Sequence, residues 1–149
     1  MKERPRRADY RYAHALTTRW ADNDVYGHVN NVAYSAFFDS AANAFLIGPG
    51  GLDIHGGEVI GLVVESACQY HAPVAYPSPL VAMVRVDRLG TRAVTYGIAV
   101  FTDDAAADAE ERDRAVAHGH FVHVFVDRAT RRPVAMPDRL RAALATITI

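Results

Sequence analysis

The sequence has few of the features that mark disulfide-stabilised, zinc-binding or membrane proteins. Cys68 is the only cysteine among 149 residues, which excludes an internal disulfide and a cysteine-based zinc site. No apolar run approaches the roughly 18 residues that a membrane-spanning helix needs. The basic N-terminus is not followed by the apolar stretch of a secretory signal. We therefore expect a cytoplasmic protein with no membrane partner.

The chain also lacks a surplus of charge of either sign. Lys and Arg number 16, Asp and Glu number 17, and the formal net charge is -1. General nucleic-acid binding needs a basic surplus, so no nucleic-acid partner is predicted. Half of the residues (50%) are hydrophobic and 22% are charged, which is typical of a globular protein. The length is that of a single domain spanning residues 1–149.

The clearest periodicity predicts one long helix. Asn30 or Asn31 can cap its start through a side-chain amide, and Gly48, followed by Pro49, ends it. The residues that recur at helical spacing between these limits are Ala33, Tyr34, Phe37, Phe38, Ala41, Ala44 and Phe45. This apolar stripe is wide and aromatic, which indicates a helix that is covered on several sides.

Alternating and β-branched patterns predict five strands around this helix. The strands are expected at residues 10–20, 58–71, 80–89, 93–101 and 114–127. Residues 1–8 are expected to be loose, residues 102–112 to form a loop, and residues 137–144 to form a short terminal helix. One helix against consecutive antiparallel strands is an α+β arrangement. Its two edge strands invite pairing with a second copy, so we expect at least a symmetric dimer.

The segment between the first strand and the helix holds most of the candidate catalytic groups. Asp22, Asp24 and His28 precede the amides Asn30 and Asn31 at the helix start. A helix N-terminus offers free N–H donors and partial positive charge, so a nearby carboxylate can act as nucleophile or base while the donors hold an oxyanion. The same residues also have purely structural interpretations. The aspartates can bond turn amides, the asparagines can be caps, and His28 can be a structural histidine.

Three histidines near the end of the chain give no convincing metal site. In a regular strand His118 and His120 lie on one face, and His123 lies on the other with Phe121 and Phe125. The three imidazoles cannot converge on one metal ion without a bulge. We therefore expect no metal and interpret these histidines as core or interface residues, with a zinc site as the alternative.

Two other charged features leave alternatives open. Glu65 stands in a strand among apolar residues, where it could line a cavity or pair with an arginine such as Arg85. Arg88, Thr91 and Arg92 surround the turn at Gly90, and a further cluster follows the last strand: Arg128, Arg131 and Arg132. Such arginines are either solvated charge or a phosphate-binding patch, because a guanidinium matches phosphate oxygens with two donors.

The motif at the helix start carries a family resemblance. Its residues are Asp22, Asp24, Gly27, His28, Val29, Asn30, Asn31 and Tyr34. In this order and spacing they resemble the hotdog-fold acyl-CoA thioesterases of the 4-hydroxybenzoyl-CoA thioesterase type. The similarity covers roughly residues 10–127 and includes the segments 68–73 and 88–92. It implies a five-stranded sheet that wraps one central helix, and dimers that join their sheets.

The resemblance also implies functional roles at the helix start. Asp24 corresponds to the catalytic carboxylate of the family, acting as nucleophile or general base. The backbone N–H of Asn31 corresponds to the group that polarises the thioester carbonyl. His28 matches a branch of the family with histidine at this position, where it can orient Asp24 or the substrate.

The same resemblance identifies the substrate class. Arg88, Thr91 and Arg92 match positions that contact the phosphates of coenzyme A. We therefore expect an acyl-CoA thioesterase that acts as a homodimer or homotetramer, with coenzyme A as part of the substrate and no other cofactor. Two alternatives remain: a hydratase or dehydratase of the same fold that uses His28 as base, and a non-catalytic acyl-CoA binding module.

Overall fold

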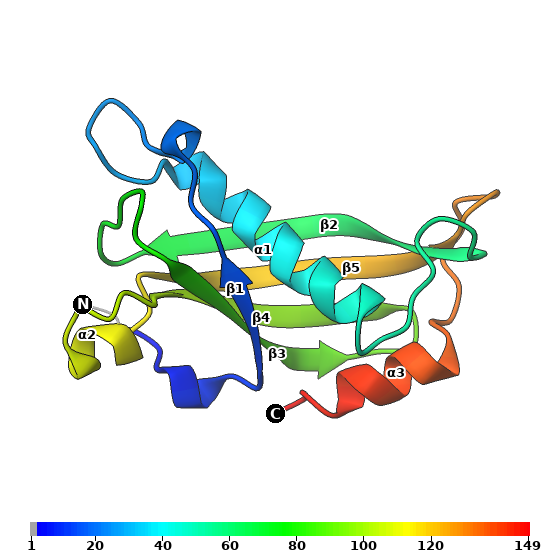
Figure 1. The fold of residues 1–149 in the computed structure, drawn as a ribbon. Coiled ribbons are helices and arrows are strands. Elements are labelled where there is room, and N and C mark those ends of the chain that lie inside the picture. The colour runs from blue at the N-terminus through cyan, green and yellow to red at the C-terminus, as the bar shows by residue number, and fades with distance from the viewer. Residues whose placement is uncertain (1–2) are drawn as a thin grey trace.

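A five-stranded antiparallel sheet packed against one long helix forms the body of the molecule (Figure 1). The computed structural model describes residues 3–149. Its strands are β1 (Tyr12–Leu16), β2 (Val59–Tyr70), β3 (Leu80–Leu89), β4 (Ala93–Thr102) and β5 (Ala117–Asp127). They lie in the order β1-β3-β4-β5-β2, so β1 and β2 are the edges of the sheet. The predicted α+β fold is confirmed.

The long helix α1 (Asn31–Ile47) lies across one face of the sheet (Figure 1). Of the two candidate caps, Asn30 is the one used, because its side chain accepts a hydrogen bond from the Val32 N–H at 3.0 Å. Phe38 and Phe45 are almost completely buried. Burying one such side chain contributes roughly 2–3 kcal/mol, so the aromatic stripe holds α1 in a fixed position on the sheet.

Side chains on the sheet alternate between the α1 side, called here the inner face, and the opposite outer face. The core lies between α1 and the inner face and contains Val84, Tyr96, Phe121 and Phe125. A second, smaller cluster covers one end of the outer face with Tyr10, Val81, Ala99, Phe101 and Ala115.

The N-terminal segment is held in place rather than loose, contrary to the expectation for residues 1–8. Arg4 forms an ion pair with Glu111, and Arg6 forms one with Asp113, each at 2.8 Å. Residues 7–9 then form a short 3-10 helix, η1 (Arg7–Asp9). The sequence does not predict these ion pairs, because their acidic partners lie more than a hundred residues further along the chain. Residues 1–2 of the expected loose segment lie outside the described part of the chain.

Two other sequence expectations need correction. The first strand is shorter than expected, since β1 pairs with β3 over only five residues and a 3-10 turn, η2 (Trp20–Asp22), follows. The expected loop 102–112 contains the start of a short helix, α2 (Ala109–Asp113), because the Asp108 side chain caps it by accepting from the Glu111 N–H at 2.8 Å. The terminal helix is confirmed as α3 (Asp138–Ala145).

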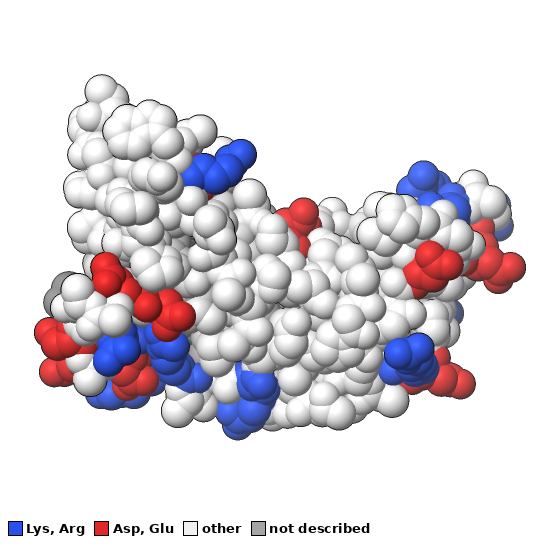
Figure 2. Space-filling model, viewed as in Figure 1, with Lys and Arg blue, Asp and Glu red and all other residues white. Residues whose placement is uncertain are grey.

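Charged side chains are unevenly distributed on the face seen in Figure 2. They gather at two opposite ends of the molecule, and the surface between them is almost free of charge. No helix in the described part of the chain is long and apolar enough to cross a membrane.

His123 is a titratable group inside the core. It lies on the inner face with Phe121 and Phe125, as the strand alternation predicts, and is only 2% exposed. A hydrogen bond of 3.1 Å joins its Nδ1 to Tyr96 Oη. Burial lowers the pKa of His123 to about 4, opposed only partly by the charge of Asp39. The native protein therefore keeps this imidazole neutral at neutral pH.

This burial makes folding stability depend on pH. An unfolded chain takes up a proton on His123 near pH 6.5, whereas the native protein does so only near pH 4. The free energy of unfolding should therefore fall by about 2 kcal/mol between pH 7.5 and pH 5 because of this residue. The double variant His123→Phe/Tyr96→Phe removes both partners of the buried bond and should lose this part of the pH dependence. Urea denaturation at several pH values measures it, with the exposed His55→Asn as control; an unchanged pH dependence in the double variant would contradict the assignment.

Candidate active site

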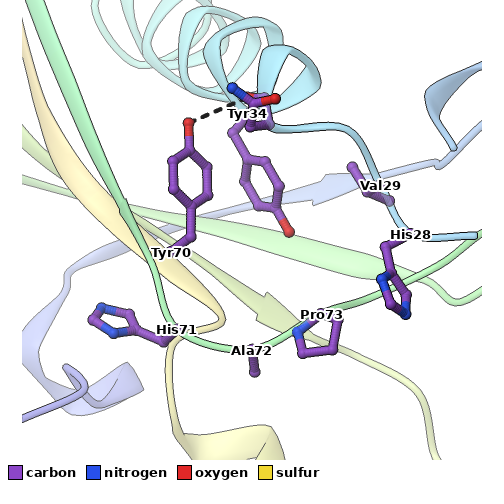
Figure 3. A pocket seen from close by; sticks show the side chains of 8 residues that line it. His28, Val29, Tyr34, Tyr70, His71, Ala72 and Pro73 are labelled. Atoms are coloured by element: carbon purple, nitrogen blue, oxygen red, sulfur yellow. Dashed lines mark hydrogen bonds between the residues drawn. The ribbon is translucent and has the colours of Figure 1, made fainter. Parts of the chain in front are cut away.

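A pocket of about 340 Å³ lies at the N-terminus of α1 (Figure 3). Its walls come from the segment that enters the helix, from the first turn of α1 and from the chain that leaves β2. The lining residues are His28, Val29, Asn31, Tyr34, Tyr70, His71, Ala72 and Pro73. Both the motif at the helix start and the 68–73 segment singled out from sequence contribute to this one pocket.

The first turn of α1 presents a free donor to this pocket. The Asn31 N–H makes no hydrogen bond with any described residue, as expected for the first residue of a helix. Tyr70 Oη donates a hydrogen bond of 3.3 Å to the Asn31 carbonyl oxygen and so ties the end of β2 to the helix start (Figure 3). A carbonyl oxygen placed in the pocket can therefore meet an N–H that is already oriented by the helix.

Tyr34 adds a second polar group that the sequence analysis did not assign to the site. Its ring is buried beside the ring of Tyr70, and its hydroxyl points into the pocket toward the side of His28 and Pro73 (Figure 3). Burial raises the pKa of Tyr34 to about 12, so the hydroxyl stays protonated and can donate a hydrogen bond. Its position in the motif at the helix start is the one sequence feature that points to the site, whereas its helical spacing predicts a core residue.

Asp24 lies in the tight turn that leads to the pocket. Its carboxylate Oδ1 accepts a hydrogen bond of 2.9 Å from the Tyr26 N–H, and its backbone N–H donates to the His28 carbonyl at 2.9 Å. Gly27, at φ 84°, closes the turn in a conformation that favours glycine. Asp24 is half-buried and is not one of the lining residues of the pocket. The turn thus uses one carboxylate oxygen, and Oδ2 has no hydrogen-bond partner among the described residues.

Asp22, the other carboxylate of the motif, is fully engaged in structure. It is 5% exposed, and its carboxylate accepts hydrogen bonds from the Arg19 N–H at 2.7 Å and from the Arg19 guanidinium at 2.8 Å. The Arg19 hydrogen bonds hold the pKa of Asp22 below its usual range against the opposing effect of burial. Its backbone carbonyl also accepts from the Asn30 N–H at 2.8 Å, so this residue anchors the loop to the helix cap.

His28 lies at the rim of the pocket. Its side chain is exposed and lines the pocket opposite Tyr70 and His71 (Figure 3). Among the described residues, no hydrogen bond joins the imidazole of His28 to the carboxylate of Asp24. The structure therefore brings His28 and Asn31 together at the pocket. Asp24 lies in the turn that precedes His28 and does not line the pocket.

A second pocket, of about 510 Å³, lies on the outer face of the sheet around the β3–β4 turn. It is lined by Glu65, Arg88, Gly90, Thr91, Arg92, Ala93, Thr95 and Val122. All three residues expected to contact phosphates are present. Neither the Arg88 nor the Arg92 guanidinium makes a hydrogen bond with a described residue, which leaves both available to an anionic ligand.

The structure places Glu65 and the histidines in defined contacts. Glu65 lines the second pocket and pairs with His120 at 2.9 Å, while Arg85 pairs with Asp87 at 2.8 Å. His118 hydrogen-bonds to His71 at 2.7 Å between ring nitrogens. Within residues 3–149 no cluster of three or more histidine, cysteine or acidic side chains is placed to hold a metal ion.

The model of the Thioesterase-like superfamily matches residues 18–144, and the chain belongs to this superfamily. No curated protein sequence matches the chain.

Solved structures agree with this assignment. The PA5185 protein from Pseudomonas aeruginosa strain PAO1 is 54% identical, with a TM-score of 0.90, over 97% of this chain and 96% of that one. The PA2801 protein from P. aeruginosa, a predicted thioesterase, is 30% identical, with a TM-score of 0.78, over 89% and 96%. Slr0204, a 1,4-dihydroxy-2-naphthoyl-CoA thioesterase from Synechocystis, is 14% identical, with a TM-score of 0.76, over 90% and 95%. The expected hotdog fold is confirmed.

The two aspartates of the motif should respond differently to substitution. Asp22→Asn replaces a buried acceptor of three Arg19 hydrogen bonds with an amide that sets an N–H₂ against those donors. We expect the free energy of unfolding to drop by about 1–2 kcal/mol. Asp24→Asn keeps the acceptor for the Tyr26 N–H and should leave stability within about 0.5 kcal/mol. Urea denaturation of both variants at pH 7 compares them, and equal losses would argue against the structural role of Asp22.

Proposed function

We propose that the protein is an acyl-CoA thioesterase that hydrolyses the thioester to a carboxylic acid and free coenzyme A, without a further cofactor. The observation that carries this proposal is the unengaged N–H of Asn31, a residue that lines the first pocket, in a chain of the thioesterase-like superfamily. The thioester carbonyl would accept from this N–H, so that the negative charge developing on its oxygen is stabilised where it forms. One such donor typically lowers the barrier by about 3 kcal/mol.

Asp24 is the carboxylate we assign to the chemistry. If Asp24 attacks the thioester carbon itself, the carbon–sulfur bond breaks to release the thiolate, and water then hydrolyses the resulting acyl-aspartyl anhydride to the carboxylic acid and restores Asp24. If Asp24 acts as base, it takes a proton from the water that attacks the carbon, the carbon–sulfur bond breaks, and that proton passes to the leaving thiolate. Asp22 is unsuited to this task, because Arg19 occupies its oxygens. Asp24 has an oxygen free for it and stands in the turn next to His28. His28 and the Tyr34 hydroxyl would then orient the substrate.

The second pocket fits the other end of the substrate. Coenzyme A carries several phosphate charges, and Arg88 and Arg92 are free to bind them beside the hydroxyl of Thr91. Slr0204, which shares the fold, is named for a coenzyme A thioester. This supports coenzyme A as the carrier.

We further propose that the working unit is a homodimer formed through β2. This edge strand runs for twelve residues, and Leu62, Val63 and Val64 are 37%, 45% and 60% exposed. A long apolar edge with unpaired backbone groups is a template for a second strand. A second copy that pairs its own β2 here would extend the sheet and lie beside Tyr70 at the wall of the first pocket.

One observation favours a second candidate function. His28 lines the first pocket, whereas Asp24 does not. A hydratase or dehydratase acting on acyl thioesters would use such an imidazole as its base. Incubation with an enoyl-CoA separates the two: loss of the double bond without thiol release indicates hydration, and thiol release from saturated acyl-CoA indicates hydrolysis.

Asp24→Asn should abolish thioester hydrolysis. Losing the nucleophile or base should reduce kcat at least 100-fold, while the fold and the KM for acyl-CoA change little. Release of free thiol from a panel of short, long and aromatic acyl-CoA substrates measures the effect. Asp22→Asn is the matched control, since it should lose stability and retain more activity at low temperature. Hydrolysis by Asp24→Asn within a few-fold of the unchanged protein would remove Asp24 from the mechanism.

Val64→Glu should weaken the dimer. Its side chain is exposed at an irregularity of the β2 edge, so two copies paired through β2 would place the new carboxylates close together. Sedimentation velocity should show a shift from dimer to monomer, and thiol release should fall with it. Ile149→Glu, which adds the same charge at an exposed residue of the C-terminus, serves as control. A Val64→Glu protein that remains dimeric at micromolar concentration would place the interface elsewhere.

A further inference from the structure

Four side chains of the second pocket form a single row across the outer face of the sheet. Cross-strand partners join Arg88 of β3 to Thr95 of β4, and Thr95 to Val122 of β5. Val122 is in turn the partner of Glu65 on β2. All four residues line the same pocket. The row therefore has a cation at one end, an anion at the other, and two uncharged residues between them.

Both charged ends of the row are placed there by irregularities in the strands. The register of β3 shifts between Val86 and Arg88, and the register of β2 shifts between Val63 and Glu65. With regular alternation Arg88 and Glu65 would each fall on the inner face, against α1. A β-bulge that redirects a side chain is a common device next to functional sites. Here two independent shifts of register bring opposite charges to one pocket.

Glu65 is held in a fixed position but keeps an acceptor free. His120 lies on the same face of β5, and its Nε2–H donates to Glu65 Oε1 at 2.9 Å. Glu65 Oε2 has no hydrogen-bond partner among the described residues, and the side chain is 65% exposed. The guanidiniums of Arg88 and Arg92 do not reach it in the structure. His120 therefore orients the carboxylate, which forms no ion pair with these arginines and can still accept a hydrogen bond.

The floor between the two ends is flat and mostly apolar. Neighbouring outer-face pairs join Ala93 to Val124 and Val124 to Leu62, next to Thr95 and Val122. Three strand spacings of about 4.8 Å separate the backbones of Arg88 and Glu65 by about 14 Å. A ligand that fits this row has an anionic end, a flat body and hydrogen-bond donors at the far end. A nucleotide with an adenine base has these properties.

We propose that Glu65, oriented by His120, binds the adenine of coenzyme A by accepting a hydrogen bond from its exocyclic amino group, while the phosphates lie at Arg88 and Arg92. This inference rests on the proposed function and defines which part of coenzyme A the second pocket recognises. It makes Glu65 a specificity-determining residue for the nucleotide end of the substrate. The same pocket would then prefer coenzyme A to thioester carriers without adenosine.

The sign of one mutational effect distinguishes this role from an accidental negative charge. A carboxylate that only happens to lie near bound phosphates repels them, so that its removal strengthens nucleotide binding. A carboxylate that accepts from the base contributes to binding, so that its removal weakens it. Because its oxygen atoms only accept, Glu65 also distinguishes adenine, which presents an amino group, from hypoxanthine, which presents a carbonyl at that position.

Isothermal titration calorimetry measures the Kd of adenosine 3′,5′-bisphosphate and of inosine 3′,5′-bisphosphate, and so tests the proposal without any thioester chemistry. The unchanged protein should bind the adenosine compound about 10-fold more tightly, and Glu65→Ala should lose this preference by weakening the adenosine compound about 10-fold. His120→Gln should weaken it about 3-fold. Glu58→Ala, which removes an equal charge just before β2, should change neither affinity, and Arg88→Ala should weaken both compounds alike.

The proposal is overturned if Glu65→Ala binds the adenosine compound equally or more tightly, or if the unchanged protein binds the two compounds alike or binds neither. These outcomes are separable from failure of the proposed function. Thiol release that depends on Asp24 can persist while the preference for adenine is absent, and a preference for adenine can be measured in a protein that releases no thiol.

Discussion

The burial of α1 against the inner face of the sheet is the interaction on which both the fold and the site depend. Phe38 and Phe45 fix the helix along its length, and the Asn30 cap fixes where it begins. Because the helix cannot shift, the Asn31 N–H keeps one direction relative to Tyr70 at the end of β2. In the proposed reaction this donor stabilises the developing oxyanion most if it is oriented before the substrate arrives, since reorganisation would cost part of that stabilisation.

The sequence predicted these parts well for a physical reason. A wide aromatic stripe at helical spacing, next to alternating apolar strands, has few ways to be buried, so the α+β class, the cap region and the terminal helix could be expected. The ion pairs of Arg4 and Arg6 with residues more than a hundred positions away could not, because nothing local identifies which charges will meet. The short β1 has a different, local cause: hydrogen bonds between Arg19 and Asp22 stabilise a 3-10 turn where the strand pattern would continue.

The candidate site was predictable in composition but not in geometry. Alternation along β3 and β2 gives each residue a face only while the strand is regular. The shifts before Arg88 and Glu65 reverse the face of both, and no residue type in either strand marks the reversal. Likewise, the motif predicts that Asp24 and Asn31 belong to the same site. In the structure, the turn that closes at Gly27 leaves Asp24 outside the lining of the pocket. The helical spacing of Tyr34 predicts a core residue, and its ring is indeed buried in the core. Its hydroxyl, however, reaches the pocket.

The two pockets lie on opposite faces of the sheet, and this places a constraint on any ligand that uses both. Tyr70 and Glu65 belong to the same strand, five residues apart, so the pockets are separated along β2 by about 17 Å. A substrate with its thioester at Asn31 and its nucleotide at Arg88 must therefore cross the β2 edge from the inner to the outer face. The extended arm of coenzyme A between thiol and phosphates is the part that would make this crossing. A partner strand paired along the whole of β2 would close this route, so the proposed dimer and a substrate that occupies both pockets of one chain are compatible only if the pairing leaves part of the β2 edge open.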